Sequence, residues 1–164
     1  MGLMLPAELV SLLGVLGYTW PEADESKLLE MGQAWLAFPD RLAAPVAEAD
    51  QWARRVWTEN RDSAIERFQE TWQAGDSAKG NLDDGASAAA LIGAGLMVCA
   101  GIVLALKINV IVQLTLLAIQ IAQAVATAAV TFGASLLEIP IFKLITGVII
   151  DQLLNMATEA VLGG

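Results

Sequence analysis

Charge is almost absent from the second half of this chain, and this limits what the chain can fold into. Residues 85–106 carry no charged side chain, Lys107 follows, and residues 108–137 again carry none. No proline occurs between Pro45 and Pro140, and alanine and leucine are abundant. Such a stretch predicts helices that pack against other helices or against a lipid bilayer.

Two segments of this stretch, residues 86–106 and 110–130, are each long enough to cross a membrane. Only Lys107-Ile108-Asn109 separates them, and without glycine or proline a tight hairpin is not expected there. A single helix over residues 85–132 would be roughly 70 Å long, about twice the ~30 Å hydrocarbon core of a bilayer. We therefore favour burial in a bundle or an oligomer, with membrane insertion as the alternative.

Uncharged polar residues recur at steps of four and seven along the second segment, which places them on one side of a helix. In a bundle this side would face solvent, whereas in a bilayer it would line a pore or a seam between helices. The alternative function is therefore a membrane-inserting channel or pore-forming domain that uses residues 86–136. The polar stripe consists of Asn109, Gln113, Gln120, Thr127 and Thr131.

The first half of the chain keeps a seven-residue repeat of apolar positions, which predicts a helix with one packing seam. Asp24 is the expected N-cap of this helix. Because Pro39 and Pro45 fall inside it, we expect one long kinked helix, with two shorter helices broken at Phe38 as the alternative. We expect the seam to pack on the apolar long helix. The predicted interface comprises Leu28, Met31, Trp35, Phe38, Leu42, Trp52 and Val56, together with Phe68 and Trp72 from the following helix.

Turn and cap signals divide the rest of the chain. Residues 6–16 predict a short helix that begins at a proline and ends before a glycine. Ser63 and Glu66 have the spacing of a capping box at the start of another helix. The clearest loop signal covers residues 75–85, and a last helix is expected from about residue 141 to 162.

These elements predict an all-α fold, an elongated helical bundle built on a long antiparallel helical hairpin with a short N-terminal helix and a C-terminal helix. At 164 residues the chain is long enough for one domain with a core. We therefore expect a single helical domain over residues 1–164. Residues 1–84 would supply acidic amphipathic helices, and residues 85–164 the apolar long helix and the C-terminal helix.

Composition argues against several classes of function. The net charge is −9, from 18 acidic and nine basic residues, and this balance disfavours nucleic acid and anionic lipid headgroups as partners. Histidine is absent and Cys99 is the one cysteine, which removes the commonest general base and thiolate metal cages. The carboxylate clusters are better explained as acids at helix starts. We predict no catalytic residue, no cofactor, no metal site and no small-molecule substrate, so the protein is not expected to be an enzyme.

Four segments resemble one family. They are Leu-Gly-Tyr-Thr-Trp-Pro-Glu-Ala-Asp-Glu at residues 16–25, Met-Gly-Gln-Ala-Trp at 31–35, the helix with Phe68 and Trp72, and the apolar run 103–108. They are similar to the WXG-like N-terminal domains of actinobacterial polymorphic toxins, of the outer-membrane-channel and necrotizing-toxin type. The resemblance implies a non-enzymatic module for export or delivery by type VII secretion. Such modules are normally joined to a C-terminal toxin, so the chain is either a domain of a longer protein or a variant without a toxin.

The signature associated with that secretion system has two parts, a Trp-x-Gly turn and a Tyr-x-x-x-Asp/Glu element. The run from Trp72 to Gly75 has one residue more than the first part, whereas Tyr18 and Glu22 match the second. The resemblance implies Tyr18 and Glu22 as a secretion element and a helical partner or a homodimer, whereas the apolar stretch makes a lipid bilayer a further possible partner. It also implies a secreted or cell-surface location without a signal peptide, or membrane association.

Overall fold

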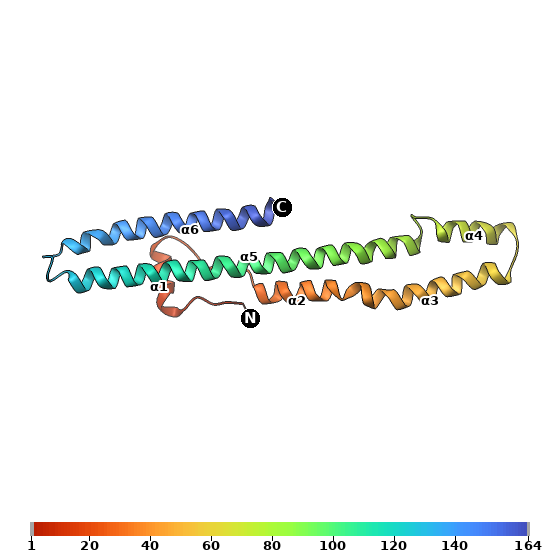
Figure 1. Cartoon of the computed structure of the whole chain (residues 1–164), viewed down its shortest axis with the longest axis horizontal. Helices are drawn as coiled ribbons and strands as arrows, with labels where there is room; N and C mark the ends of the chain where they lie inside the picture. Colours follow the sequence, from red (N-terminus) through yellow and green to blue (C-terminus); the bar gives the residue numbers. More distant parts are fainter. Residues whose placement is uncertain (1, 164) are drawn as a thin grey trace. The chain divides into compact units, whose positions relative to one another are not determined.

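The computed structural model describes residues 2–163 and confirms the all-α class. Helices make up 82% of the structure, and no strand occurs among the described residues. Figure 1 shows the elements in chain order. They are α1 (Ala7–Val15), α2 (Glu25–Leu36), α3 (Phe38–Glu59), α4 (Ser63–Gln73), α5 (Ala78–Thr127), the 3-10 helix η1 (Ala134–Leu137) and α6 (Glu138–Leu162).

The helices form two compact units. The apolar unit combines Met1–Lys27 with Cys99–Gly164, and the amphipathic unit is Leu28–Val98. The boundary between the units therefore falls inside α5, not at the expected change of composition after residue 84. The assignment of the whole chain to a single domain stays a prediction.

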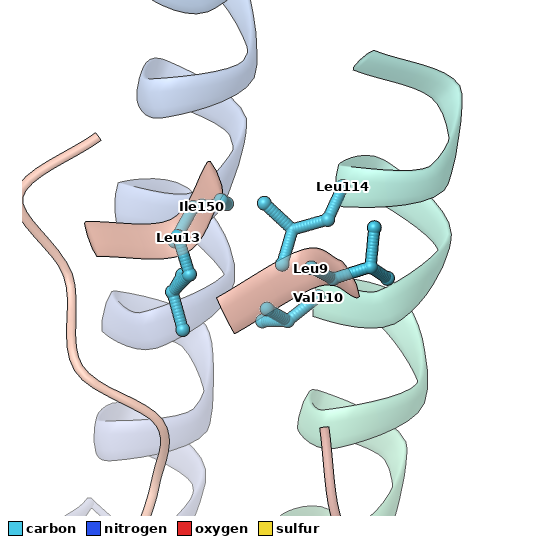
Figure 2. Close-up of a cluster of buried hydrophobic side chains, with 5 residues drawn as sticks. All are labelled: Leu9, Leu13, Val110, Leu114 and Ile150. Carbon is cyan, nitrogen blue, oxygen red and sulfur yellow. The ribbon is translucent and has the colours of Figure 1, made fainter. Parts of the chain in front are cut away.

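The core of the apolar unit lies where α1 packs against α5 and α6. Figure 2 shows Leu9 and Leu13 of α1 directed towards Val110 and Leu114 of α5 and Ile150 of α6. All five side chains are buried, and burying an aliphatic side chain of this size contributes about 1.5–3 kcal/mol. The short N-terminal helix, which the proline and glycine signals predicted, is thus the central element of this core.

The long helix α5 is continuous through Lys107 and begins seven residues earlier than expected. The backbone N–H of Gly80 donates to Ser77 Oγ at 3.0 Å, and the N–H of Asn81 donates to the carbonyl of Ser77 at 2.9 Å. Ser77 therefore caps the helix, and the predicted loop over residues 75–85 was mostly wrong. At the other end of the chain, α6 begins at Glu138 because Pro140 lies in its first turn, where a missing N–H costs little.

The amphipathic unit begins with α2 and α3, which are two helices, as the alternative prediction had it. Ala37 separates them, and Pro39 in the first turn of α3 removes a backbone donor at this break. Pro45 lies inside α3 without ending it. Both helices run antiparallel to the first half of α5, and α4 connects them to it (Figure 1).

Two predicted caps had different outcomes. Asp24 Oδ1 accepts hydrogen bonds from the N–H groups of Ser26 at 3.1 Å and Lys27 at 3.2 Å, so the cap of α2 is confirmed. The capping box at Ser63 was wrong. Asp62 caps α4 instead, because its Oδ1 accepts from two N–H groups of the first turn, at 2.7 and 3.0 Å.

Candidate functional site

Two glycines, Gly32 of α2 and Gly93 of α5, lie where these two helices approach closely. Both residues are buried. A Cβ atom built on Gly93 would lie 2.8 Å from the carbonyl oxygen of Gly32 and 3.0 Å from the backbone nitrogen of Leu36. A Cβ on Gly32 would lie 2.9 Å from the carbonyl oxygen of Gly93. Only glycine on both helices permits this separation.

The residues that follow Gly32 in register lie on the same side of α2 and α3, and the nearest of them, Leu36, approaches Gly93 of α5. They lie one position after the predicted seam and repeat with the same seven-residue period. Part of this face borders a groove of about 410 Å³ between α3 and the start of α5. The face, which we call the small seam, consists of Gly32, Leu36, Pro39, Ala43, Val46, Asp50, Ala53 and Trp57.

The predicted seam, which we call the bulky seam, is largely exposed. The side chains of Met31 and Trp52 are 51% and 57% exposed, and Trp35, Phe38 and Val56 are also exposed. Leu28 and Leu42 are half-buried, and Leu42 borders the groove beside α5. The expectation that the bulky seam packs on the long helix is therefore not met at Met31 and Trp52, which are more than half exposed, and for the other members it stays a prediction. Its role as an interface with another molecule stays a prediction.

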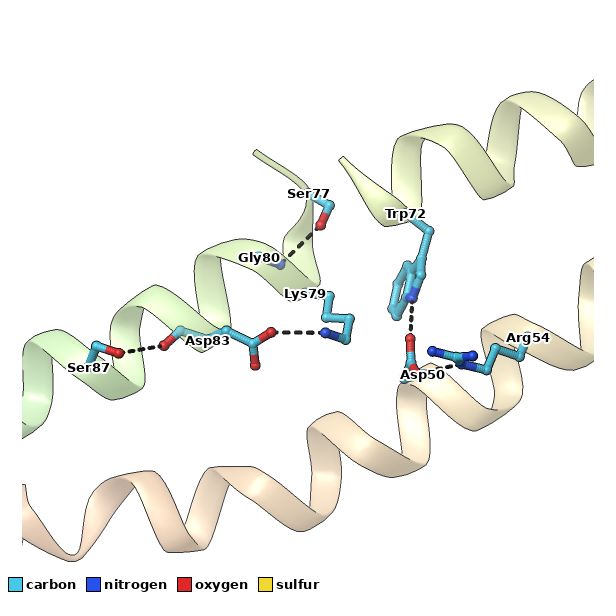
Figure 3. A network of polar contacts seen from close by, with 8 residues as sticks. All are labelled: Asp50, Arg54, Trp72, Ser77, Lys79, Gly80, Asp83 and Ser87. Carbon is cyan, nitrogen blue, oxygen red and sulfur yellow. Dashed lines mark hydrogen bonds and ion pairs between the residues drawn. The ribbon is translucent and has the colours of Figure 1, made fainter. Parts of the chain in front are cut away.

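The two predicted interface residues of α4 pack at the corner between α3 and α4. The ring of Phe68 lies 5.9 Å from that of Trp57 and 6.1 Å from that of Trp72, measured between centroids. Trp72 Nε1 donates to Asp50 Oδ1 at 3.0 Å, and Arg54 Nε donates to Asp50 Oδ2 at 2.7 Å (Figure 3). The Arg54 guanidinium, with the indole N–H second, holds the pKa of Asp50 below its usual range.

The rest of this polar network is local to the first turns of α5. Lys79 Nζ contacts Asp83 Oδ2 at 2.9 Å, and this carboxylate raises the pKa of Lys79 (Figure 3). The lysine is therefore paired with an acid four residues further along its own helix. Exposed pairs of this kind contribute little to stability. The network fixes the α3–α4 corner and the start of α5, and it presents no unpaired cation to a ligand.

The candidate secretion element lies in the segment between α1 and α2, which is not helical. Tyr18 is half-buried, and its hydroxyl donates to the carbonyl of Gly147 in α6 at 2.9 Å. Hydrogen bonding with the Asp151 carboxylate raises the pKa of Tyr18, and burial and the negative charge of Asp151 raise it further. Glu22 is exposed. The two residues therefore do not share a helix face.

Sequence reasoning missed a buried ion pair in the apolar unit. Lys107 Nζ lies 2.8 Å from Glu25 Oε2, and their side chains are 3% and 8% exposed. The ammonium also donates to the carbonyl of Ala23 at 2.6 Å, and Glu25 Oε1 accepts from the N–H of Leu3. Burial alone would raise the pKa of Glu25, but the hydrogen bonds from Lys107 and Leu3 lower it to about 2.

The polar stripe is only partly a feature of one helix. Thr131 lies beyond the end of α5, and three of the five side chains bond to nearby backbone. Asn109 Nδ2 donates to Ala105 at 2.8 Å, Thr127 Oγ1 to Gln123 at 2.9 Å, and Thr131 Oγ1 to Thr127 at 3.0 Å. Gln113 and Gln120 are half-buried. The side chains of Asn109, Thr127 and Thr131 are therefore bonded to the backbone of their own segment and not arranged along a continuous water-lined path.

No group of three or more potential metal-ligating side chains occurs among residues 2–163. One helical stretch, Ser63–Thr127, which includes α5, is long and apolar enough to cross a membrane, and 17% of its most apolar window is buried. Core helices of soluble proteins pass the same test of length and composition.

The fold is all helical among the described residues, and apolar side chains of α2 and α3 such as Met31 and Trp52 are exposed. A comparison with models of protein families identifies the family to which this helical protein belongs. Residues 5–147 match the model of the WXG100-like domain, so the chain belongs to this family. Neither the comparison with curated proteins nor the comparison with solved structures found a match.

Membership makes the chain a helical protein of the type VII secretion class. WXG100 proteins are secreted through type VII systems and typically form helical dimers with partners.

Proposed function

We propose that this chain is a non-enzymatic secretion and assembly module of a toxin-like protein delivered by type VII secretion. It works by packing the bulky seam of α2 and α3 against a helix of a partner or of a second copy of the chain. The observation that carries the proposal is the exposure of Met31 and Trp52 of this seam, beside the close approach of Gly32 and Leu36 to Gly93 of α5. Membership of the WXG100-like family supports it, since that family pairs helices.

The chemistry of the seam suits a protein interface. Trp52 is exposed, and the guanidinium of Arg55 lies 4.5 Å from the centroid of its ring. Trp35 and Phe38 pack edge to face with centroids 6.2 Å apart. Tryptophan and arginine are enriched among the residues that dominate binding energy. The residues best placed to act as anchors are therefore Trp35 at the end of α2 and Trp52 in α3.

The test compares two charged substitutions at exposed positions of the same unit. Trp52→Glu removes an anchor of the seam, and Leu91→Glu is the control on α5, where Leu91 is 76% exposed. We expect a wild-type complex in solution, with the dissociation constant raised at least roughly thirtyfold by Trp52→Glu and unchanged by Leu91→Glu. Light scattering measures the mass, and export is measured in a cell with a type VII system.

Two results would contradict this proposal. One is a wild-type chain that stays monomeric at every concentration while Trp52→Glu is exported normally. The other is an equal increase of the dissociation constant by both substitutions, which would indicate non-specific association through the exposed surface. Tyr18 and Glu22 stay candidates for the export signal, and Glu22→Gln tests them, since Glu22 is exposed and its removal leaves the Tyr18 contact with Gly147 in place.

Pore formation by residues 86–136 is the second candidate, supported by the exposed apolar surface of α5. It predicts leakage of dye from liposomes, weakened when Gln113 and Gln120 become leucine. Liposomes that remain intact over a wide range of protein concentration would exclude it.

A further inference from the structure

The hairpin formed by α5 and α6 ends in a strongly apolar turn, which we call the hairpin tip and define as residues 128–137 (Figure 1). Three of its side chains are almost fully exposed: Phe132 at 98%, Val130 at 82% and Leu137 at 75%. No charged residue occurs between positions 108 and 137. Exposing this much apolar surface to water is unfavourable. We therefore expect the tip to be covered by a binding partner or by lipid.

The polar groups of the tip bond inward. Ser135 is buried, and its hydroxyl donates to the carbonyl of Ala124 at 2.7 Å, while Thr131 Oγ1 donates to the carbonyl of Thr127 at 3.0 Å. The N–H of Gly133 donates to the carbonyl of Ala128 at 2.8 Å. A loop in water can leave such groups to the solvent, whereas a loop in lipid must satisfy them internally because no water is present.

The distribution of apolar residues favours lipid over a protein partner. In α3 and α4 the apolar residues are concentrated on one side, as for a helix that packs against another helix. In α5 and α6 they surround the helix, and beside the tip Val125 and Ile141 are both more than half exposed. A partner helix would cover one side only, but a bilayer covers all sides of the tip.

Charged residues limit how deep the hairpin can enter. Glu138 begins α6 and Lys143 follows one turn later, and these are the only charges from residue 108 to 150. Either side chain would be unfavourable at the centre of a bilayer. The overall charge of −9 gives no attraction to anionic lipid.

From this arrangement we propose that the hairpin tip inserts shallowly into an uncharged lipid bilayer. Phe132 and Val130 enter the hydrocarbon first, and Glu138 and Lys143 stay at the level of the headgroups. The chain is thereby anchored to the membrane surface without crossing it and without forming a pore. This anchoring needs no partner helix, so it does not rest on the function proposed for the bulky seam.

The test is flotation of the full chain with phosphatidylcholine vesicles. Phe132 has a left-handed backbone with φ of 50°, a conformation that asparagine tolerates better than phenylalanine. Phe132→Asn therefore removes the leading apolar side chain without straining the fold. The matched control is Leu162→Gln at the far end of α6, where Leu162 is 78% exposed.

We expect Phe132→Asn to weaken vesicle binding roughly tenfold or more, as for loss of a buried phenyl group, and Leu162→Gln to bind as the wild type does. An environment-sensitive fluorophore on Val130→Cys, in a Cys99→Ser background, should shift to the blue on binding. Dye inside the vesicles should be retained.

Four outcomes would overturn the proposal. These are a wild-type chain that does not float, a Phe132→Asn variant that floats like the wild type, and equal losses in the two variants. The fourth is a change of mass in lipid-free solution caused by Phe132→Asn, which would make a second copy of the chain the occupant of the tip. Dye release by the bound wild-type chain would favour the pore instead.

Discussion

The glycine crossing between α2 and α5 predicts a measurable difference between two neighbouring glycines of one helix. Gly93 and Gly95 both lie in the part of α5 that belongs to the amphipathic unit. A Cβ on Gly93 would meet backbone atoms of α2 at 2.8 and 3.0 Å, whereas a Cβ on Gly95 would meet nothing within 4 Å. Gly93→Ala and Gly95→Ala therefore make the same chemical change with and without a steric conflict.

The magnitudes follow from two opposing effects. Replacing glycine by alanine in a helix stabilises it by about 1 kcal/mol, and Gly95→Ala should show this gain alone. At Gly93 the conflict involves backbone atoms of Gly32 and Leu36, which no change of rotamer can move. Helix α2 must shift, at a cost of roughly 1–3 kcal/mol. The two variants should therefore differ by roughly 1–3 kcal/mol in unfolding free energy, with Gly93→Ala the less stable.

Urea unfolding followed by tryptophan fluorescence measures this difference, because Trp35, Trp52, Trp57 and Trp72 all belong to the amphipathic unit. Circular dichroism before denaturation checks that both variants are equally helical. The double variant Gly32→Ala/Gly93→Ala should be less destabilised than the sum of its single changes, since α2 has already moved. Equal stability of Gly93→Ala and Gly95→Ala would refute the close crossing.

Three other predictions concern the buried ion pair and a helix cap. Lys107→Met should lower the unfolding free energy by roughly 3–5 kcal/mol because it leaves Glu25 buried and unpaired. The double variant Lys107→Met/Glu25→Leu should recover most of that loss. Thermal melts at pH 7 compare the two variants. Because the folded pKa of Glu25 is about 2, below the ordinary 4.5, the pair stabilises the wild type above about pH 4.5, and this contribution should fade as the pH drops towards 2. Because the double variant has no Glu25 carboxylate to protonate, the wild type should lose stability relative to it as the pH falls across that range, and parallel curves would contradict the pairing. Asp62→Ala should cost about 1 kcal/mol by freeing the N–H groups of Ala64 and Ile65, whereas Ser63→Ala should be nearly neutral, as urea titration can show.

Local signals in the sequence were sufficient for most helix starts but failed where two signals competed. Asp24 and the proline of the first helix acted as caps at the predicted places because each bonds or constrains its own next turn. Ser63 was chosen over Asp62, although Asp62 has the same capping ability and lies one residue earlier. The glycines and acids after residue 78 suggested a loop. They lie instead in the first turns of α5, which Ser77 caps. The helix tolerates these residues because its later turns are rich in alanine and leucine, which favour helix.

The ion pair between Lys107 and Glu25 shows a different limit of sequence reasoning. A lone lysine in an apolar stretch requires a partner if it is buried, and this requirement can be read from the sequence. The identity of the partner cannot, because Glu25 is 82 residues away and is one of 18 acids. The fold selects Glu25 because the segment after α1 passes beside α5, where Trp20 also lies near the lysine, 5.8 Å from ring centroid to ammonium.

The main error concerned which of two adjacent seams meets α5, and it has a physical cause that bears on function. Both seams repeat every seven residues. Side-chain size alone predicts that the seam with Trp35, Phe38 and Trp52 is the one that packs on α5. Close helix contact instead favours small residues, since Gly32 and Gly93 let the two backbones approach. A contact between small residues buries little apolar area, whereas each tryptophan of the bulky seam can bury about 150–250 Å². If the bulky seam binds a partner as proposed, that contact buries much of the apolar area of α2 and α3, and the stability of this unit should rise with the concentration of that partner.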